Sequence, residues 1–245
     1  MNNSKEDLGN LDSENLLLVG IPSVGMVGAF AISYLVHHLK MEGVGELNFS
    51  KITPAFVIKN GKMLGPVQIY RKNNVYAILS RIPLDLTSAY EFTKSVVDFA
   101  KKSKIKKIIV PRGLAIIGKQ TVEPTSLGLS MNKNSESLLK KYHLSSIPDG
   151  SIFGADAGVI SALKDENVPS IILFTTCRPI FPDPEATVQS ISTLAKILNV
   201  KVETEQIKKS LESISKKNRL LIEETEKAVH REQEEHPSVS SPGIG

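Results

Sequence analysis

The chain has 245 residues, with 30 Lys and Arg against 26 Asp and Glu, and a hydrophobic content of 41%. These values support one large domain, or one domain with an appendage, around a sizeable core. Cys177 is the only cysteine, which excludes an internal disulfide and a cysteine metal cluster. The sequence has no run of 18 apolar residues, and its first 14 residues are polar. We therefore expect no membrane span, no signal peptide and a cytoplasmic location.

Five lysines fall in the run KKSKIKK at 101–107. A nucleic-acid-binding face combines a broad basic surface with aromatic side chains, yet aromatic residues make up 5% of this chain and Trp is absent. We interpret the run as the solvated end of a helix followed by the start of a strand. We expect no nucleic-acid partner.

The first part of the chain predicts a strand, a helix and two hairpins. Residues 1–14 are interpreted as a disordered leader. The apolar run 15–21 predicts a strand buried on both faces, and an amphipathic helix follows it. Asn60-Gly61 and Asn73-Asn74 each predict a tight hairpin turn, because these residues tolerate positive φ.

The next part alternates between helices and strands. The pattern predicts a helix from about Thr87, a strand over 106–111, a short helix near 135–141, a glycine loop leading into a helix, and a strand over 170–175. Asp183 and Pro184 predict a helix with an acidic N-cap and proline as its first residue. Residues 15–202 therefore predict an α/β domain with a mixed sheet flanked by helices.

Beyond residue 202 the sequence becomes highly charged and lacks Gly and Pro until 236. Residues 203–235 predict a long amphipathic helix, and a coiled coil is a second possibility. Residues 236–245 predict a flexible tail. The predicted helix carries a heptad-like seam: Ile207, Leu211, Ile214, Asn218, Leu221, Thr225 and Ala228.

A glycine-containing stretch, LLLVGIPSVGMVGAF, occupies residues 16–30. A phosphate-binding P-loop needs Lys followed by Ser or Thr after its last glycine, whereas Gly28 is followed by Ala29 and Phe30. The glycine spacing also differs from the G-x-G-x-x-G fingerprint of dinucleotide-binding folds. We predict that this loop binds no nucleotide.

Close packing explains the same stretch better. Ser23 is predicted to cap the helix by accepting hydrogen bonds from its free N–H groups. Gly25, Gly28 and Ile32 have three- and four-residue spacing and are predicted to share one side of the helix. A strand of the same sheet or another subunit would then approach the backbone there.

Residues suited to catalysis are sparse. His37 and His38 are adjacent, so on a helix they point about 100° apart and do not form a metal pair. Cys177, at the end of a predicted strand, is interpreted as a small core residue. Arg112 and Asp156 are candidates for the polar lining of a crevice, or for hydrogen bonds within loops. We predict no catalytic, cofactor-binding or metal-binding residue, and hence no enzyme activity.

Four segments resemble the proteasome assembly chaperone family, and in particular its archaeal homologues of the second-type chaperone. The segments are GIPSVGMVGAFAISYLVHHLKMEGVGEL, PAFVIKNGKMLGPVQIY, GADAGVISALKDENVPSIILFT and PDPEATVQSISTLAKIL. They appear in this order between about residues 16 and 202. The block GIPSVGMVG is the most specific of them.

The resemblance implies a fold similar to that of purine nucleoside phosphorylases, homo-oligomers, and non-enzymatic binding to proteasome α-subunits or assembly intermediates. Archaeal members can end in a hydrophobic residue, Tyr and any residue, a tail that docks between α-subunits. This chain ends in Gly-Ile-Gly. We therefore expect binding through the folded surface, or through Leu211, Ile214 and Leu221 of the charged helix.

An alternative function belongs to a different class. The chain would be a small-molecule binder or enzyme for a nucleoside or a carboxylate, with a phosphorylase-like crevice near Arg112 and Asp156. Some relatives have been labelled ATP-dependent carboxylate–amine ligases, but no motif for that chemistry appears in this sequence. Whether these residues surround an open pocket would separate the two hypotheses.

Overall fold

The computed structural model describes residues 14–50, 56–59, 61–116, 123–147, 149–214 and 216. Residues 1–13 of the leader expected over 1–14, the charged segment from 217 and the expected tail lie outside the described residues. Glu14 itself is held in place, because the Asn74 side chain donates to its carbonyl oxygen at 3.0 Å and Lys107 pairs with its carboxylate at 2.8 Å.

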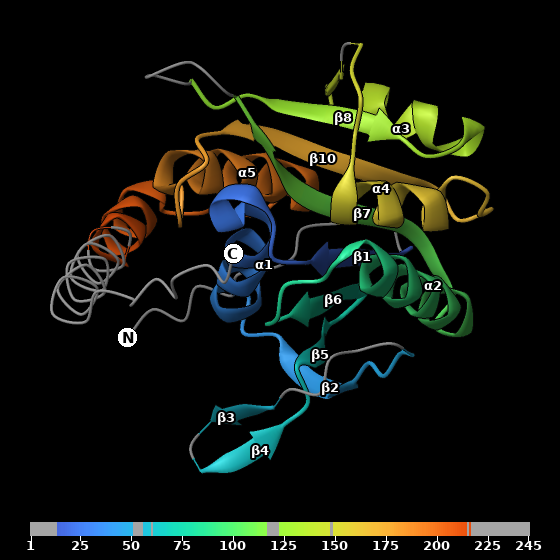
Figure 1. Cartoon of the computed structure of the whole chain (residues 1–245), viewed down its shortest axis with the longest axis horizontal. Coiled ribbons are helices and arrows are strands. Elements are labelled where there is room, and N and C mark those ends of the chain that lie inside the picture. The colour runs from blue at the N-terminus through green and yellow to red at the C-terminus, as the bar shows by residue number, and fades with distance from the viewer. Residues whose placement is uncertain are drawn as a thin grey trace, which may run out of the picture.

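The described part of the chain contains strands interspersed with helices (Figure 1). The strands are β1 (Asn15–Gly20), β2 (Glu42–Glu46), β3 (Val57–Lys59), β4 (Lys62–Leu64), β5 (Val67–Lys72), β6 (Val75–Ser80), β7 (Ile105–Ala115), β8 (Ser126–Ser130), β9 (Ser145–Ser146) and β10 (Ser170–Cys177). The helices are α1 (Val27–His38), α2 (Leu86–Lys102), α3 (Glu136–Lys141), α4 (Gly154–Leu163) and α5 (Pro184–Leu198), with short turns η1 (Val24–Met26) and η2 (Lys133–Ser135). A further helix covers residues 204–214.

Eight strands form one mixed sheet in the order β2-β5-β6-β1-β7-β10-β8-β9. The central strands β6, β1, β7 and β10 are parallel, whereas β5 and β2 on one side and β8 on the other run antiparallel to their inner neighbours. The strands β3 and β4 form a separate two-stranded hairpin. This architecture confirms the predicted α/β class with a mixed sheet flanked by helices.

The two faces of the sheet are covered by different helices. Leu16 and Leu18 of β1 belong to one core cluster with side chains of α1 and α5, whereas Leu17 and Val19 belong to a second cluster with α2 and α4. Successive side chains on a strand point to opposite faces, so an unbroken apolar run is needed when both faces are buried. The strand predicted from this run is confirmed.

Local signals set the boundaries of several elements. The Asp85 carboxylate caps α2 by accepting from the Ser88 N–H at 2.7 Å. Asp183 caps α5 and Pro184 is its first residue, as predicted. Asn73 adopts a φ of 52° in the turn between β5 and β6, which confirms that hairpin. The strand predicted over 106–111 is longer, because β7 extends to Ala115 along β10.

Candidate functional site

The glycine-containing loop does not form one continuous helix from Ser23. It makes the short turn η1, in which Gly25 has a φ of 63°, and α1 begins only at Val27. Gly25 therefore lies before α1 and does not share a helix face with Gly28. The predicted cap is also wrong, because the Ser23 hydroxyl makes no capping hydrogen bond and instead accepts from the Gly113 N–H at 3.2 Å.

The glycines here allow the loop and α1 to approach the strands closely. A Cβ at Gly28 would overlap the backbone carbonyl of Pro111 in β7. A Cβ at Gly20 would come within 2.8 Å of the Ile32 Cβ, and one at Gly113 would overlap the Val24 carbonyl. The element that approaches the backbone of α1 is thus a strand of the same chain, and Ile32 is fully buried beneath it.

Arg112 and Asp156 are brought together. The Arg112 side chain lies just beyond the last residue of β1, is 2% exposed, and forms an ion pair through Nε with the Asp156 carboxylate on α4. Its NH1 group donates to the Ile21 carbonyl at 3.2 Å. In open α/β sheets, ligands bind beyond the carboxyl ends of the parallel strands. Here Arg112 and Asp156, which were predicted to line such a crevice, form an ion pair with each other instead.

A second polar cluster follows β10. The Arg178 guanidinium pairs with Asp183 at 3.0 Å and with Glu185 at 3.3 Å, and the Asp183 carboxylate also accepts from the Arg178 backbone N–H at 2.7 Å. Burial, with a smaller contribution from the negative charge of Asp183, raises the pKa of the Cys177 thiol to about 12. A thiol with this pKa is a poor nucleophile at neutral pH, consistent with the interpretation of Cys177 as a core residue.

The 204–214 helix lies against the domain rather than apart from it. Ile207 and Leu211 are 7% and 5% exposed and belong to the core cluster that includes α1 and α5. Ile214 is 40% exposed, and Leu221 lies outside the described residues. The predicted apolar seam is therefore covered by the parent domain as far as Leu211.

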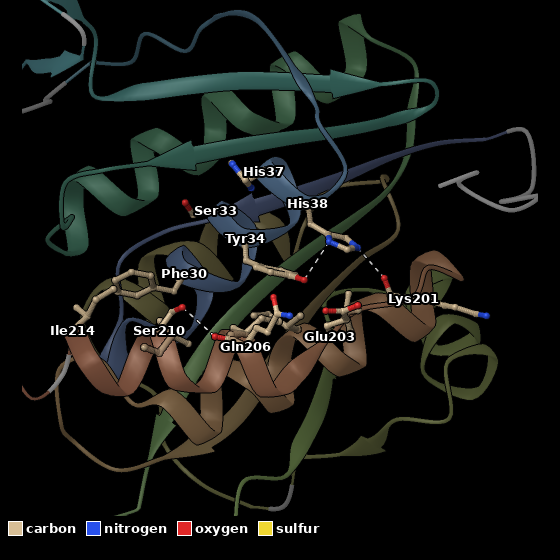
Figure 2. A pocket seen from close by; sticks show the side chains of 14 residues that line it. Phe30, Ser33, Tyr34, His37, His38, Lys201, Glu203, Gln206, Ser210 and Ile214 are labelled. Atoms are coloured by element: carbon tan, nitrogen blue, oxygen red, sulfur yellow. Dashed lines mark hydrogen bonds between the residues drawn. The ribbon is translucent and has the colours of Figure 1, made fainter. Parts of the chain in front are cut away.

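A groove of about 1090 Å³ lies between α1 and the 204–214 helix. Figure 2 shows Phe30 and Ile214 at one end and Glu203 near the other. The His38 ring stacks on Tyr34, and its Nε2 lies 2.8 Å from the Lys201 carbonyl oxygen, which ties the start of the helix to α1. We name this feature the helix groove.

The β3–β4 hairpin exposes large apolar side chains that the sequence analysis did not single out. Phe56, Ile58 and Met63 are 67%, 78% and 68% exposed. The sequence signal for this surface is the unbroken apolar run before Asn60-Gly61. A strand that covers a core on one face alternates apolar and polar residues, so an unbroken run places apolar side chains on its other face as well.

Within the described residues, no group of three or more His, Cys, Asp or Glu side chains could hold a metal ion. The same part of the chain contains no helix with the length and apolar character that a membrane crossing requires.

The PAC2 family model matches residues 17–221. The chain belongs to the PAC2 family. The predicted kinship with proteasome assembly chaperone homologues is confirmed. PbaA of Pyrococcus furiosus, described as an archaeal homolog of proteasome-assembly chaperone, has a TM-score of 0.74 and 26% identity over 88% of this chain and 95% of its own.

Two further proteins are similar to this chain. PbaB of Pyrococcus furiosus, described as an archaeal proteasome activator, has a TM-score of 0.67 and 19% identity, with 87% of this chain and 93% of its own covered. It shares the fold. The uncharacterized protein MJ0106 of Methanocaldococcus jannaschii is 24% identical over 233 residues, which are 93% of this chain and 94% of that protein.

Proposed function

We propose that this PAC2 protein is a proteasome assembly chaperone-like factor that binds proteasome α-subunits or assembly intermediates through its folded surface, without catalysis. The observation that carries the proposal is the match to PbaA, with 26% identity and a TM-score of 0.74 over 88% of the chain. Similarity over nearly the whole domain supports a shared mode of action better than an isolated motif would.

The chemistry of the described residues supports binding rather than catalysis. Arg112 and Asp156 pair with each other, and the Cys177 thiol is held in its neutral form. Neither arrangement provides an activated nucleophile among these groups. The alternative of a nucleoside or carboxylate enzyme is therefore less well supported.

The apolar surfaces give the proposed chaperone its means of binding. The helix groove and the β3–β4 hairpin both present apolar side chains, including Ile214, Phe30 and Ile58, to the surroundings. Apolar patches of this kind mark sites of protein–protein contact. We also propose that the chain forms homo-oligomers.

The test mixes the purified full-length protein with free α-subunits from its own cell and analyses the mixture by native gel at about 50–200 mM salt, to allow for screening of exposed charges. We expect a new band that contains both proteins and persists after removal of residues 241–245. A tenfold loss of affinity on that deletion would locate binding in the tail and not in the folded surface. The absence of any complex would remove α-subunits as the partner.

A further inference from the structure

Two helices border the helix groove, and each presents a row of side chains to it. The row on α1 has the three- and four-residue spacing of a single helix face: Phe30, Ser33, Tyr34 and His37. The opposite row begins just before the 204–214 helix and has the same kind of spacing: Glu203, Gln206, Ser210 and Ile214. Eleven residues of helix rise about 16 Å, so the groove follows this helix for about three turns.

The two bordering helices run side by side in opposite directions. His38, at the end of α1, lies beside Lys201 before the second helix, whereas Phe30 and Ile214 lie together at the other end (Figure 2). A third helix can lie between two such helices, with its side chains packed between their two rows. The groove volume of about 1090 Å³ is just above the range of about 300–1,000 Å³ that drug-sized ligands occupy. The groove therefore fits a helical segment of a protein better than a small molecule.

The groove changes in chemical character from one end to the other. Phe30 and Ile214 make one end apolar, and Ile214 is 40% exposed. In the middle, Ser33 and Ser210 carry short side chains. These leave room for a close approach, because the distance between packed helices depends on the side chains at their contact. An occupant therefore needs apolar side chains at the first end and small ones in the middle.

The opposite end of the groove carries a carboxylate. Glu203 is exposed, faces the groove in Figure 2, and is the only acidic side chain among the described residues that line it. In the described part of the chain no Lys or Arg forms an ion pair with Glu203, and the ammonium of Lys201 points away from the groove. The His38 ring is already engaged with the Lys201 carbonyl oxygen and the Tyr34 hydroxyl. Glu203 is thus available to a Lys or Arg side chain of an occupant.

We propose that the helix groove binds an amphipathic helix of the proteasome α-subunit. The apolar side chains of that helix contact Phe30 and Ile214, and its small side chains pack against the two serines. A Lys or Arg at its other end pairs with Glu203. This inference rests on the proposed function, because the α-subunit is the partner proposed there. It adds the part of the folded surface that makes the contact and the chemistry of the bound segment, which is apolar at one end and basic at the other.

The first test blocks the middle of the groove. Ser210→Trp places a large ring there, and Ser137→Trp on α3 is the matched control outside the groove lining. Both hydroxyls are exposed, and each donates to a carbonyl oxygen three or four residues earlier. The full-length proteins are titrated with free α-subunits on native gels, and circular dichroism checks that each variant is folded. We expect Ser210→Trp to weaken binding about tenfold through overpacking, and the control to bind as the unmodified chain does.

The second test addresses the charged end of the groove. Glu203→Lys brings like charges together and is expected to weaken binding about threefold at about 50 mM salt, the range of an exposed ion pair. The effect should be smaller at about 200 mM salt, because exposed charges are then screened. Glu205→Lys is the control, since it makes the same change of charge on the same helix at an exposed position outside the groove lining. Equal weakening by both variants would overturn the pairing at Glu203.

Cross-linking identifies the segment that lies in the groove. Ser210→Cys is labelled with a benzophenone maleimide, since the native Cys177 is buried, and the cross-linked peptide of the α-subunit is identified by mass spectrometry. We expect one segment with apolar residues three or four positions apart and a Lys or Arg near one end. A segment without this pattern, or equal cross-linking from Ser137→Cys, would contradict the proposed occupant.

The outcomes separate this site from the proposed function. A complex that Ser210→Trp leaves unchanged would overturn the groove as the binding site, while the chaperone function would stand. If the unmodified chain forms no complex with α-subunits, the function fails and the site fails with it. Light scattering of the chain alone covers the remaining occupant, because a smaller oligomer for Ser210→Trp would assign the groove to a second copy and overturn the proposal.

Discussion

The backbone carbonyl of Pro111 in β7 lies against the Cα of Gly28 in α1, in the space that any side chain at position 28 would need. The obstacle is backbone, which cannot rotate away as a flexible side chain could. This contact brings the first helix directly onto the sheet, and it explains why a residue with no Cβ occupies the first turn of α1.

Gly28→Ala is expected to destabilise the protein by about 1–3 kcal/mol through overpacking. The sign of this change in stability is informative, because in a helix without this contact alanine would be favoured over glycine by about 1 kcal/mol. Urea denaturation measures the effect. The control is Gly45→Ala, since no atom lies within 4 Å of a Cβ placed there. Equal stability for Gly28→Ala and the unmodified chain would contradict the close contact.

Asp156→Asn is expected to cost about 2–4 kcal/mol, because it leaves the Arg112 guanidinium buried without its counter-charge. The lower part of this range applies because the Asp156 side chain remains 20% exposed. Thermal or urea unfolding measures the loss, with the exposed Asp165→Asn as control. A loss below about 0.5 kcal/mol, the usual limit for surface substitutions, would show that the pair adds little to the fold.

Glu166→Gln tests an ion-pair cluster and its pH dependence. Lys101 at 2.8 Å and Lys94 at 3.0 Å hold the pKa of Glu166 below its usual value, against the opposing effect of burial. A depressed carboxyl pKa stabilises the fold above the unfolded pKa, and this gain is lost as the pH falls through the folded pKa. We expect Glu166→Gln to lower the free energy of unfolding by up to about 1 kcal/mol at pH 7, since the lysine side chains are 45% and 53% exposed.

The difference in the free energy of unfolding between the unmodified protein and Glu166→Gln should shrink as the pH is lowered from about 5 towards about 3, because Glu166 then becomes protonated. Urea denaturation of both proteins across this range measures it. A difference that stays constant with pH would assign the effect to packing rather than charge.

Cys177 should resist alkylation in the folded protein. With a pKa of about 12 for this thiol, against about 8.5 for a free cysteine, the thiolate fraction at pH 8 is roughly 10³-fold lower. Iodoacetamide labelling, followed by mass spectrometry, should therefore be slow in buffer and fast in denaturing urea. Rapid labelling of the folded chain would show that the thiol is accessible and ionised.

Leu211→Ala should cost about 2–3 kcal/mol, because this side chain is buried in the core between the 204–214 helix and the domain. Ile214→Ala, on the same helix but 40% exposed, is the control and should cost less than about 1 kcal/mol. Chemical denaturation compares them. Equal costs would mean that the helix is not docked as described. Because Leu211 is buried within the chain, the predicted contact of this helix with a partner protein is better tested by substituting Ile214.

Features of the fold that depend on neighbouring residues could be predicted from the sequence. The apolar run of β1 indicated a strand buried on two faces, Asp183 with Pro184 indicated the start of α5, and Asn73-Asn74 indicated a hairpin turn. Each depends on side-chain alternation, a cap or a backbone preference, which act within a few residues. The family likeness also followed from short blocks of sequence.

The contacts between groups far apart in the sequence became known from the three-dimensional structure. It placed the Ser23 hydroxyl on the Gly113 N–H rather than on its own helix, paired Arg112 with Asp156 across 44 positions, and covered Leu211 with the parent domain. The physical reason is that these contacts depend on strand order and on which helix covers which face of the sheet. Local preferences leave both open, whereas burial of two apolar faces at once determines them.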